Sequence, residues 1–245
     1  GPQQEAASAP MTVELPADDD DYVFPNRIVI HKILPALLKE CRDQKMCLFA
    51  LPNVLALCTR MTEQQFSQLV LPTIHKHCMV LSDGPNKPNQ QPQISPKIPQ
   101  MVLRHLSILW AKTTLSEQKN FIIPFIVQSL QFHSNSDIQS EAMKRAEEAL
   151  NSHIIDATAF KNTFLPQIKN VCELTNSEPM RTNAVVCVGK VLSELDAVTI
   201  VNHVLPMVEN ALVKNPRNAS APLLMSCVGV LRRMSVILME NQSGL

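Results

Sequence analysis

The stretch His75-Lys76-His77-Cys78 brings three side chains that can bind a transition metal into four successive positions. Imidazole nitrogen and thiolate sulfur are ligands that zinc commonly takes in proteins. On a helix, however, residues two positions apart point about 200° away from each other, so His75 and His77 cannot hold one ion unless the helix unwinds. Ligand pairs on a helix are spaced four residues apart. We therefore predict no metal site here.

The rest of the chain contains no spacing typical of a catalytic or cofactor-binding motif. HExxH, GxSxG, Walker-type and paired-carboxylate patterns do not occur. A loop that cradles phosphate groups needs several closely spaced glycines, and the whole chain has 5. We predict that the protein is not an enzyme and has no catalytic residue, no cofactor and no small-molecule substrate.

The 7 cysteines are odd in number, and no two of them are spaced as CxxC. Most lie in apolar stretches, where reduced cysteine serves as a small hydrophobic residue. The N-terminus does not have the pattern of a signal peptide, and we expect no apolar run as long as the roughly 18–20 residues that a membrane span needs. These features predict a cytoplasmic protein.

Formal charge is balanced, with 22 basic and 22 acidic residues, but it is unevenly distributed. Residues 1–24 hold 6 acidic residues and no basic one, which leaves 22 basic against 22 − 6 = 16 acidic residues in the remainder. An excess of this size is weak evidence for binding to nucleic acid or to an anionic membrane. We expect the protein to reach membranes only through its partners.

A period of about forty residues runs through the C-terminal half of the chain. Gly189 and Gly229 each end a Cys-Val-Gly tripeptide, and Pro166 and Pro206 each end a Leu-Pro pair. A fixed period of this length is typical of helical-repeat arrays, in which each helix pair buries its apolar face against the next pair. Because glycine inside a helix is costly, we interpret the two glycines as points where the adjacent helix approaches closely.

An aliphatic residue followed by proline recurs along the chain. Proline is tolerated in the first turn of a helix and disrupts its interior. Three such prolines follow a capping-type residue by ten positions, at Thr62, Asp156 and Asp196, and Ser116 precedes Pro124 by eight. We predict that each repeat begins with a two-part helix, capped at the Thr, Ser or Asp and kinked or restarted at the proline. The pairs lie at 34–35, 51–52, 71–72, 123–124, 165–166 and 205–206.

A second helix is predicted after each polar turn, over residues 138–150, 180–195 and 221–239. Apolar residues at helical spacing give 138–150 one packed face, and the remaining polar residues give it one wet face. The stretch 223–239 has almost no polar face, although a terminal repeat needs one for solubility. We expect its exposed side to be covered by a further segment of the protein, by self-association or by a partner. The apolar face of 138–150 consists of Ile138, Ala142, Ala146 and Leu150.

These patterns predict an all-α fold, specifically a right-handed α-solenoid of about five HEAT-like helix pairs in a single domain over residues 25–240. The second unit contains a proline- and amide-rich flexible insert at 82–96. We expect residues 1–24 to be a disordered acidic leader or tag, and residues 241–245 to be a tail. The units are predicted at about 25–60, 61–114, 115–155, 156–195 and 196–240.

Basic residues on the predicted second helices are candidates for binding a protein partner. Second helices line the concave side of HEAT-type arrays, where partners dock. The alternative is that these residues are solvated helix ends. The six candidates are Lys144, Arg145, Arg181, Lys190, Arg232 and Arg233.

Several runs resemble one known family. Residues 164–172 (FLPQIKNVC) and 181–192 (RTNAVVCVGKVL) look like the HEAT-repeat region of the SCY-like pseudokinases. Residues 33–40 (ILPALLKE) resemble the segment that follows the kinase-like domain in that family, and residues 220–225 (SAPLLM) are similar to the branch associated with clathrin-coated vesicles. The chain departs from the family in lacking a glycine-rich loop, His-Arg-Asp, Asp-Phe-Gly and a clathrin-box-like stretch.

The resemblance implies a non-catalytic, protein-binding scaffold that acts as an adaptor in vesicle traffic between the Golgi, endosomes and plasma membrane. It implies a peripheral location on Golgi or endosomal vesicles, and partners such as clathrin, its adaptors or other coat machinery. Three alternatives stay open: an unrelated helical-repeat adaptor, a fragment of a transport receptor, and an RNA-binding helical repeat. The single Trp and single Tyr disfavour the last, because such repeats stack bases on aromatic side chains.

Overall fold

A computed structural model describes residues 27–81, 95–213 and 219–243. Every regular element in these ranges is a helix and none is a strand, which confirms the all-α prediction. The predicted leader 1–24 lies outside the described residues. So do residues 82–94 of the predicted insert and the last two residues of the predicted tail.

The chain forms two compact units, residues 1–36 and residues 37–245. In the described part of the first unit, the π-helical turn η1 (Val29–Ile33) leads into the first turn of α2 (Leu34–Glu40). The second unit contains the rest of α2 and all the helices that follow.

Beyond α2, the helices within residues 37–243 come in successive pairs, each with a first and a second helix. From residue 63 on, each first helix has three parts: a short α-helical turn, a π-helical turn of five residues, and a longer α-helix. In chain order they are α4 (Glu63–Gln65), η2 (Phe66–Val70) and α5 (Leu71–Cys78); α8 (Leu115–Glu117), η3 (Gln118–Ile122) and α9 (Ile123–Gln131); α11 (Ala157–Ala159), η4 (Phe160–Phe164) and α12 (Leu165–Leu174); and α14 (Ala197–Thr199), η6 (Ile200–Val204) and α15 (Leu205–Val213).

The prolines explain this three-part form. A proline has no N–H to donate, and its ring collides with the carbonyl four residues earlier. In the π-helical turn before Pro72, the Leu71 N–H bonds to the carbonyl of Phe66, five residues back, and the α-helix restarts with proline in its first turn. The same arrangement precedes Pro166 and Pro206. The predicted restart at proline is therefore confirmed, and its form is a π-helical turn.

Four capping residues begin these first helices. Thr62 and Thr114 form reciprocal capping boxes with the residue three positions on, and the carboxylates of Asp156 and Asp196 accept backbone N–H bonds at 2.6 and 2.7 Å. The prediction that Ser116 caps the second of them was wrong, because Thr114 caps α8. With this correction, the cap precedes its proline by ten positions in every case.

The second helices follow their first helices in the chain. They are α3 (Gln44–Cys58), the pair α6 (Lys97–Arg104) and α7 (Leu106–Lys112), α10 (Ser136–Asn151), α13 (Glu178–Lys190) with the 3-10 turn η5 (Leu192–Glu194), and α16 (Ala221–Ser243). The predicted helices at 138–150 and 221–239 are confirmed. The one predicted at 180–195 ends earlier, at Lys190.

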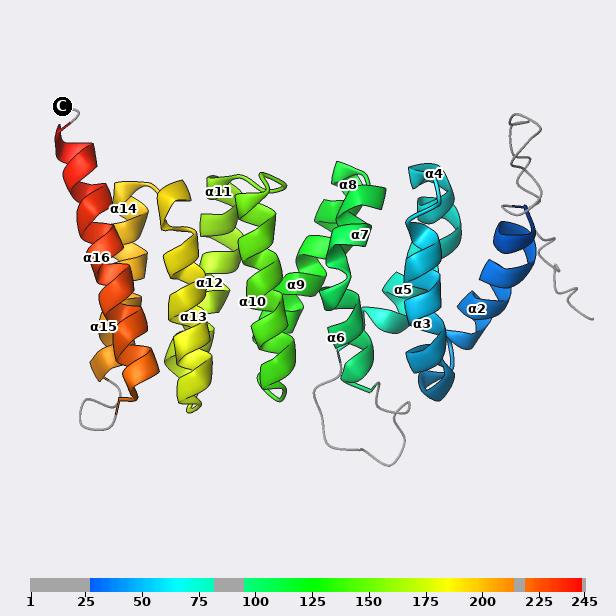
Figure 1. Cartoon of the computed structure of the whole chain (residues 1–245), viewed down its shortest axis with the longest axis horizontal. Helices are drawn as coiled ribbons and strands as arrows, with labels where there is room; N and C mark the ends of the chain where they lie inside the picture. Colours follow the sequence, from blue (N-terminus) through cyan, green and yellow to red (C-terminus); the bar gives the residue numbers. More distant parts are fainter. Residues whose placement is uncertain (1–26, 82–94, 214–218, 244–245) are drawn as a thin grey trace, which may run out of the picture. The chain divides into compact units, whose positions relative to one another are not determined.

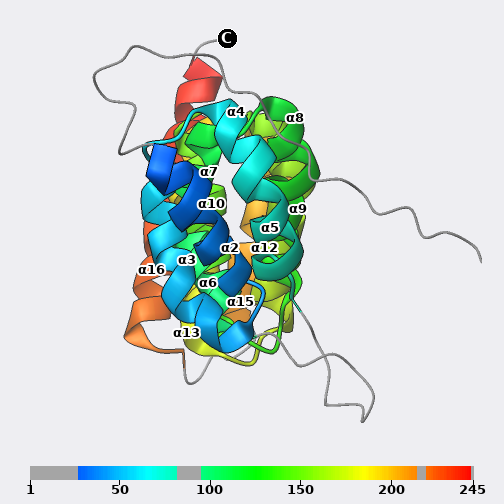
Figure 2. The same ribbon diagram turned by 90° about the vertical axis from the view of Figure 1, so that its right-hand side faces the viewer.

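Within residues 37–243 the helices pack in two layers. Second helices contact one another in the order α3, α6, α10, α13 and α16, and first helices contact in the order α9, α12 and α15. In Figure 1, α10, α13 and α16 lie side by side in chain order, and in Figure 2 α3, α13 and α16 lie on one side with α5, α9 and α12 on the other. This arrangement confirms an α-solenoid of stacked helix pairs.

The core of this unit lies between the two layers. Phe66, Phe160 and Phe164, all in π-helical turns, are fully buried there. All seven cysteines are buried and free, which agrees with the prediction of reduced cysteines in apolar positions. Burial raises the pKa of the Cys58 and Cys187 thiols to about 12, so both stay protonated and unreactive at neutral pH.

The predicted wet face of α10 is confirmed in part, at the exposed residues Lys144 and Glu148. Gln139 and Glu141 are buried as well as the apolar stripe, because α10 contacts α6 on one side, α13 on the other and α9 beneath. The Gln139 amide donates to the Leu130 carbonyl at 2.8 Å. A buried polar side chain thus joins the start of α10 to the end of α9.

The two repeat glycines differ in environment. Gly189 of α13 is buried, and a Cβ atom placed on it would lie 2.7 Å from Cγ2 of Val230 in α16. Gly229 of α16 is exposed, with nothing within 4 Å of its Cβ position. The expectation of close approach is confirmed at Gly189 and wrong at Gly229, because no described helix follows α16.

Helix α16 is long and apolar enough, over Ala221–Glu240, to cross a membrane by length and composition. The expectation that no apolar run reaches that length was therefore wrong. One face of α16, including Leu223, Cys227 and Val230, is buried against the unit. The predicted exposed apolar surface on the other face is confirmed, with Met225 72% and Val228 60% exposed.

Candidate partner-binding surfaces

The structure separates the six basic residues predicted to bind a partner. Arg181, at the start of α13, is 3% exposed. Its Nη1 donates to the Thr175 carbonyl at 3.2 Å, which ties the second helix to the turn before it. Arg181 therefore cannot reach a partner in this conformation and serves the fold.

Arg145 of α10 is tied to two carboxylates on its own helix. Its guanidinium lies 2.8 Å from Glu141 and 2.6 Å from Glu148, and its side chain is only 15% exposed. Lys144, beside it, is 60% exposed and 4.0 Å from Glu141. Of these two residues, Lys144 is the one whose charge is open to a partner.

Lys190, at the end of α13, links two second helices. Its Nζ lies 3.1 Å from the Glu147 carboxylate of α10, and the side chain is still half exposed. Two turns earlier in α13, the Asn183 amide donates to the Ser140 hydroxyl of α10 at 3.2 Å. These two contacts fix the spacing of α10 and α13, so Lys144 and Lys190 are presented from adjoining helices of one layer.

Arg232 and Arg233 are both exposed on α16. They follow Val228 and Gly229 by about one turn and Met225 by about two, on the side of the helix that carries the exposed apolar residues. This places two cations within an apolar surface, which is a different setting from the polar surroundings of Lys144.

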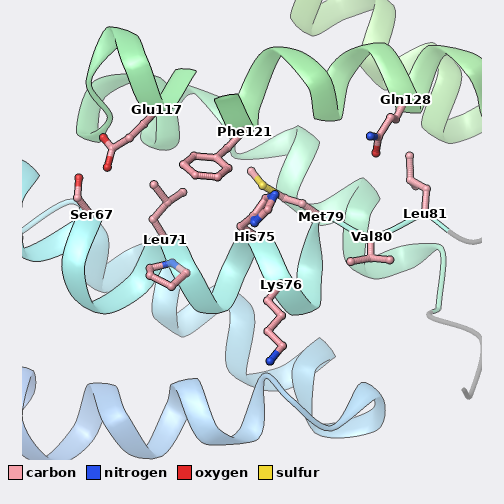
Figure 3. Close-up of a pocket in the computed structure, with 11 residues that line it drawn as sticks. Ser67, Leu71, His75, Lys76, Met79, Val80, Leu81, Glu117, Phe121 and Gln128 are labelled. Carbon is pink, nitrogen blue, oxygen red and sulfur yellow. The ribbon is translucent and has the colours of Figure 1, made fainter. Parts of the chain in front are cut away.

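A groove opens on the other layer, between α5 and η3 (Figure 3). Its volume is about 660 Å³. The rings of His75 and Phe121 meet across it with centroids 4.6 Å apart and planes tilted by 58°. Lys76 points away from Phe121 in this view. The other lining residues are Ser67, Leu71, Pro72, Met79, Val80, Leu81, Glu117 and Gln128.

The groove has an apolar floor and one acidic rim residue. Burial raises the pKa of the Glu117 carboxyl, but hydrogen bonds from Thr114 and Ser67 outweigh this and hold the pKa below its usual value. Glu117 is therefore ionised at neutral pH, and it is already engaged by Thr114. Sequence reasoning missed this groove, because its walls come from helices that no shared motif connects.

The groove also shows where the histidine-rich stretch lies. His75 turns toward Phe121, while His77 lies on another side of α5, half-buried beside Cys78. Within the described ranges, no group of three or more His, Cys, Asp and Glu side chains is placed to hold a metal ion. The groove offers contacts for an apolar side chain and a hydrogen-bonding rim.

The chain is 30% identical over 209 residues to SCY1-like protein 2 of Homo sapiens and of Mus musculus, which covers 85% of the chain and 20% of each relative. It is 25% identical over 195 residues to a protein kinase domain-containing protein of Schizosaccharomyces pombe, covering 79% of the chain and 24% of that protein. The similarity supports a relationship to the SCY1-like family. No family model matches the chain.

The match is with a part of each relative. The chain spans about a fifth of the length of the curated SCY1-like relatives. The matched residues extend over most of the chain, and the described part of this region is built of stacked helices. The activity of a whole relative can therefore be attributed to this chain only as a proposal.

Proposed function

We propose that residues 37–243 form a non-catalytic scaffold that binds proteins through the exposed face of its second helices. The observation that carries the proposal is the continuous layer α10, α13 and α16, which presents Lys144, Lys190 and the Arg232–Arg233 pair from successive helices. A layer of this kind offers a long, rigid surface held in register by the packing beneath it.

We further propose that the scaffold belongs to the HEAT-repeat region of an SCY-like pseudokinase and serves as an adaptor in vesicle traffic between the Golgi, endosomes and plasma membrane. The similarity to SCY1-like protein 2 supports this proposal, as do the repeat motifs around Pro166 and Gly189. The expected partners are clathrin, clathrin adaptors or other coat proteins, and the expected location is the cytoplasmic side of Golgi or endosomal vesicles.

Co-sedimentation with purified clathrin-coated vesicles tests both parts. The protein is mixed with coated vesicles and, separately, with the same vesicles after their coats have been stripped. We expect the protein to pellet with the coated vesicles only. Binding to stripped vesicles would instead indicate direct lipid contact, and absence of binding to both would refute the trafficking role.

A pair of charge-neutralising variants tests the surface. Lys144→Gln with Lys190→Gln removes two cations from the second-helix layer and keeps a hydrogen-bonding group beside Glu147. Lys39→Gln with Lys119→Gln removes two exposed cations elsewhere and serves as the matched control. We expect the first variant to raise the dissociation constant obtained from co-sedimentation about tenfold, a change of about 1.4 kcal/mol in binding free energy, and the control to bind as wild type. Equal binding by both variants would contradict the assigned surface.

A helical-repeat adaptor of unrelated role is the alternative. It predicts the same sensitivity to Lys144 and Lys190 with a different partner, and no preference for coated over stripped vesicles. RNA binding is tested by titrating a single-stranded RNA against the protein at two salt concentrations, because phosphate contacts weaken steeply with salt.

A further inference from the structure

The packing of α16 on α13 defines a specific kind of helix seat. Gly189 has no side chain, and Cγ2 of Val230 occupies the space that a Cβ atom would fill. Val185 and Val188, on the same helix, are fully buried around this contact. The seat therefore consists of a glycine with one apolar residue directly before it and another one turn earlier, and the residue that fills it is β-branched.

Helix α16 carries the same seat forty positions later, on its own far side. Met225, Val228 and Gly229 stand where Val185, Val188 and Gly189 stand in α13. Here, however, Met225 and Val228 are exposed, and nothing lies within 4 Å of the Cβ position of Gly229. The seat on α13 is thus filled by α16, whereas no described residue fills the corresponding seat on α16.

The next helix of the same register does not follow directly. After Lys190 the chain turns through η5, and Asp196 caps the next first helix. Forty positions after Asp196 stands Val236, which cannot cap, and α16 continues without a break to Ser243. The described residues therefore contain no helix that fills the Gly229 seat.

The positive charge of Arg232 and Arg233 on the far side of α16 indicates what kind of helix could bind there. Arg232 and Arg233 are exposed one turn after Gly229, between the apolar residues Met225 and Val236. An antiparallel second copy centred on Gly229 would place Ser226 and Met225 opposite Arg232 and Arg233, so it would offer these arginines no acidic partner. A span across a membrane would place both arginines in the hydrocarbon interior, which is strongly unfavourable.

We propose that the far side of α16 binds an amphipathic helix of a partner protein, which places a β-branched residue on Gly229 and acidic residues beside Arg232 and Arg233. The contact repeats the α13–α16 packing at the apolar centre and adds ion pairs at its edge. This proposal is independent of the trafficking role, because it rests on the geometry of α13 and α16 alone.

Two synthetic peptides of residues 221–240 serve as probes, because this sequence already fills one such seat with Val230. Both contain Arg232→Gln and Arg233→Gln. The acidic probe also contains Ser226→Glu and Leu231→Glu, which flank the contact stripe of the peptide, and the basic probe contains Ser226→Lys and Leu231→Lys. Binding of each labelled probe to the protein is measured by fluorescence anisotropy at low and physiological salt.

We expect the acidic probe to bind about tenfold more tightly than the basic probe, and Arg232→Glu with Arg233→Glu in the protein to reverse this preference. Gly229→Leu in the protein is expected to weaken the acidic probe about tenfold by filling the seat. Ala111→Leu, at an exposed position of α7, is the matched control and should have no effect. Because the space around Gly229 is open and leucine favours a helix over glycine, Gly229→Leu should melt no lower than wild type, so a loss of binding is not a loss of fold.

The remaining outcomes overturn the proposal. Equal binding of the two probes, or binding that Gly229→Leu leaves unchanged, would show that the probe does not dock on this seat. A dimer in sedimentation velocity that Met225→Asp dissociates would assign the surface to a second copy. Flotation of the protein with vesicles of phosphatidylcholine and phosphatidylserine, abolished by Met225→Asp, would assign it to lipid.

Discussion

Val230 of α16 occupies the place of a missing side chain in α13, because a Cβ atom on Gly189 would lie only 2.7 Å from its Cγ2. This contact sets how closely two successive second helices approach. Val230 is β-branched and has little rotamer freedom in a helix, so it cannot easily move aside. The helix spacing therefore depends on one glycine.

Substitutions at the two repeat glycines should have opposite effects on stability. Gly189→Leu is expected to lower the free energy of unfolding by about 2–3 kcal/mol through overpacking against Val230. Gly229→Ala is expected to raise it by about 0.5–1 kcal/mol, because alanine favours an exposed helix over glycine and meets no neighbour. Urea denaturation of both variants provides the measurement. Equal stability of Gly189→Leu and wild type would contradict the close approach.

Thr114 should contribute more to stability than Ser116. The Thr114 side chain and Glu117 form a capping box at the start of α8, whereas Ser116 is exposed within that turn. Thr114→Ala is expected to cost about 1 kcal/mol, and Ser116→Ala close to nothing. Thermal denaturation of the two variants side by side tests this; the reverse order would show that the cap lies two residues later.

Asp196 should make stability depend on pH. The backbone N–H of Thr199 donates to its carboxylate and holds its pKa below the usual value, with the Thr199 hydroxyl and Lys161 adding to the effect. A depressed pKa means that the stabilisation is present above the unfolded pKa of about 3.8 and is lost as pH falls through the folded pKa. Asp196→Asn keeps a capping oxygen and removes the charge. We expect it to be less stable than wild type at pH 7 and equal to it near pH 2, as measured by urea denaturation at both pH values.

Gln139 should be far more sensitive to truncation than Gln131. The Gln139 amide is buried and donates to the Leu130 carbonyl, whereas Gln131 is exposed and bonds the side chain of Gln167. Gln139→Ala leaves a buried carbonyl without its partner and is expected to cost about 1–3 kcal/mol. Gln131→Ala should stay within about 0.5 kcal/mol of wild type. Similar losses in the two variants would show that the link between α9 and α10 is not carried by Gln139.

Local features of the fold were accessible from sequence because they depend on neighbouring residues. Helix restarts at Pro72, Pro166 and Pro206 follow from the missing N–H and the ring of proline, which act within one turn. The caps at Thr62 and Asp196 follow in the same way from side-chain bonds to nearby N–H groups. The error at Ser116 had a local cause too, since Thr114 offers the same hydroxyl two residues earlier with Glu117 in capping-box position.

The candidate surface was harder to predict from sequence, because the exposure of a residue depends on which helices lie alongside it. Lys144 and Arg181 are both basic residues near the middle or start of a second helix, yet one is largely exposed and the other is buried against the turn at Thr175. The single apolar stripe of 138–150 predicts that its polar residues face solvent, whereas helices on both sides of α10 cover two of them, Gln139 and Glu141.

From sequence alone came the period of about forty residues, which recurring motifs display directly, together with the α-helical class and the breaks at proline, which arise from the backbone and side chains of one turn. Tertiary structure alone decided that Gly189 is filled while Gly229 is open, that Arg181 is buried, and that a groove separates α5 from η3. Identical tripeptides have identical local preferences, but the atoms that meet them belong to other helices. What lies next to a residue is settled only when the layers pack.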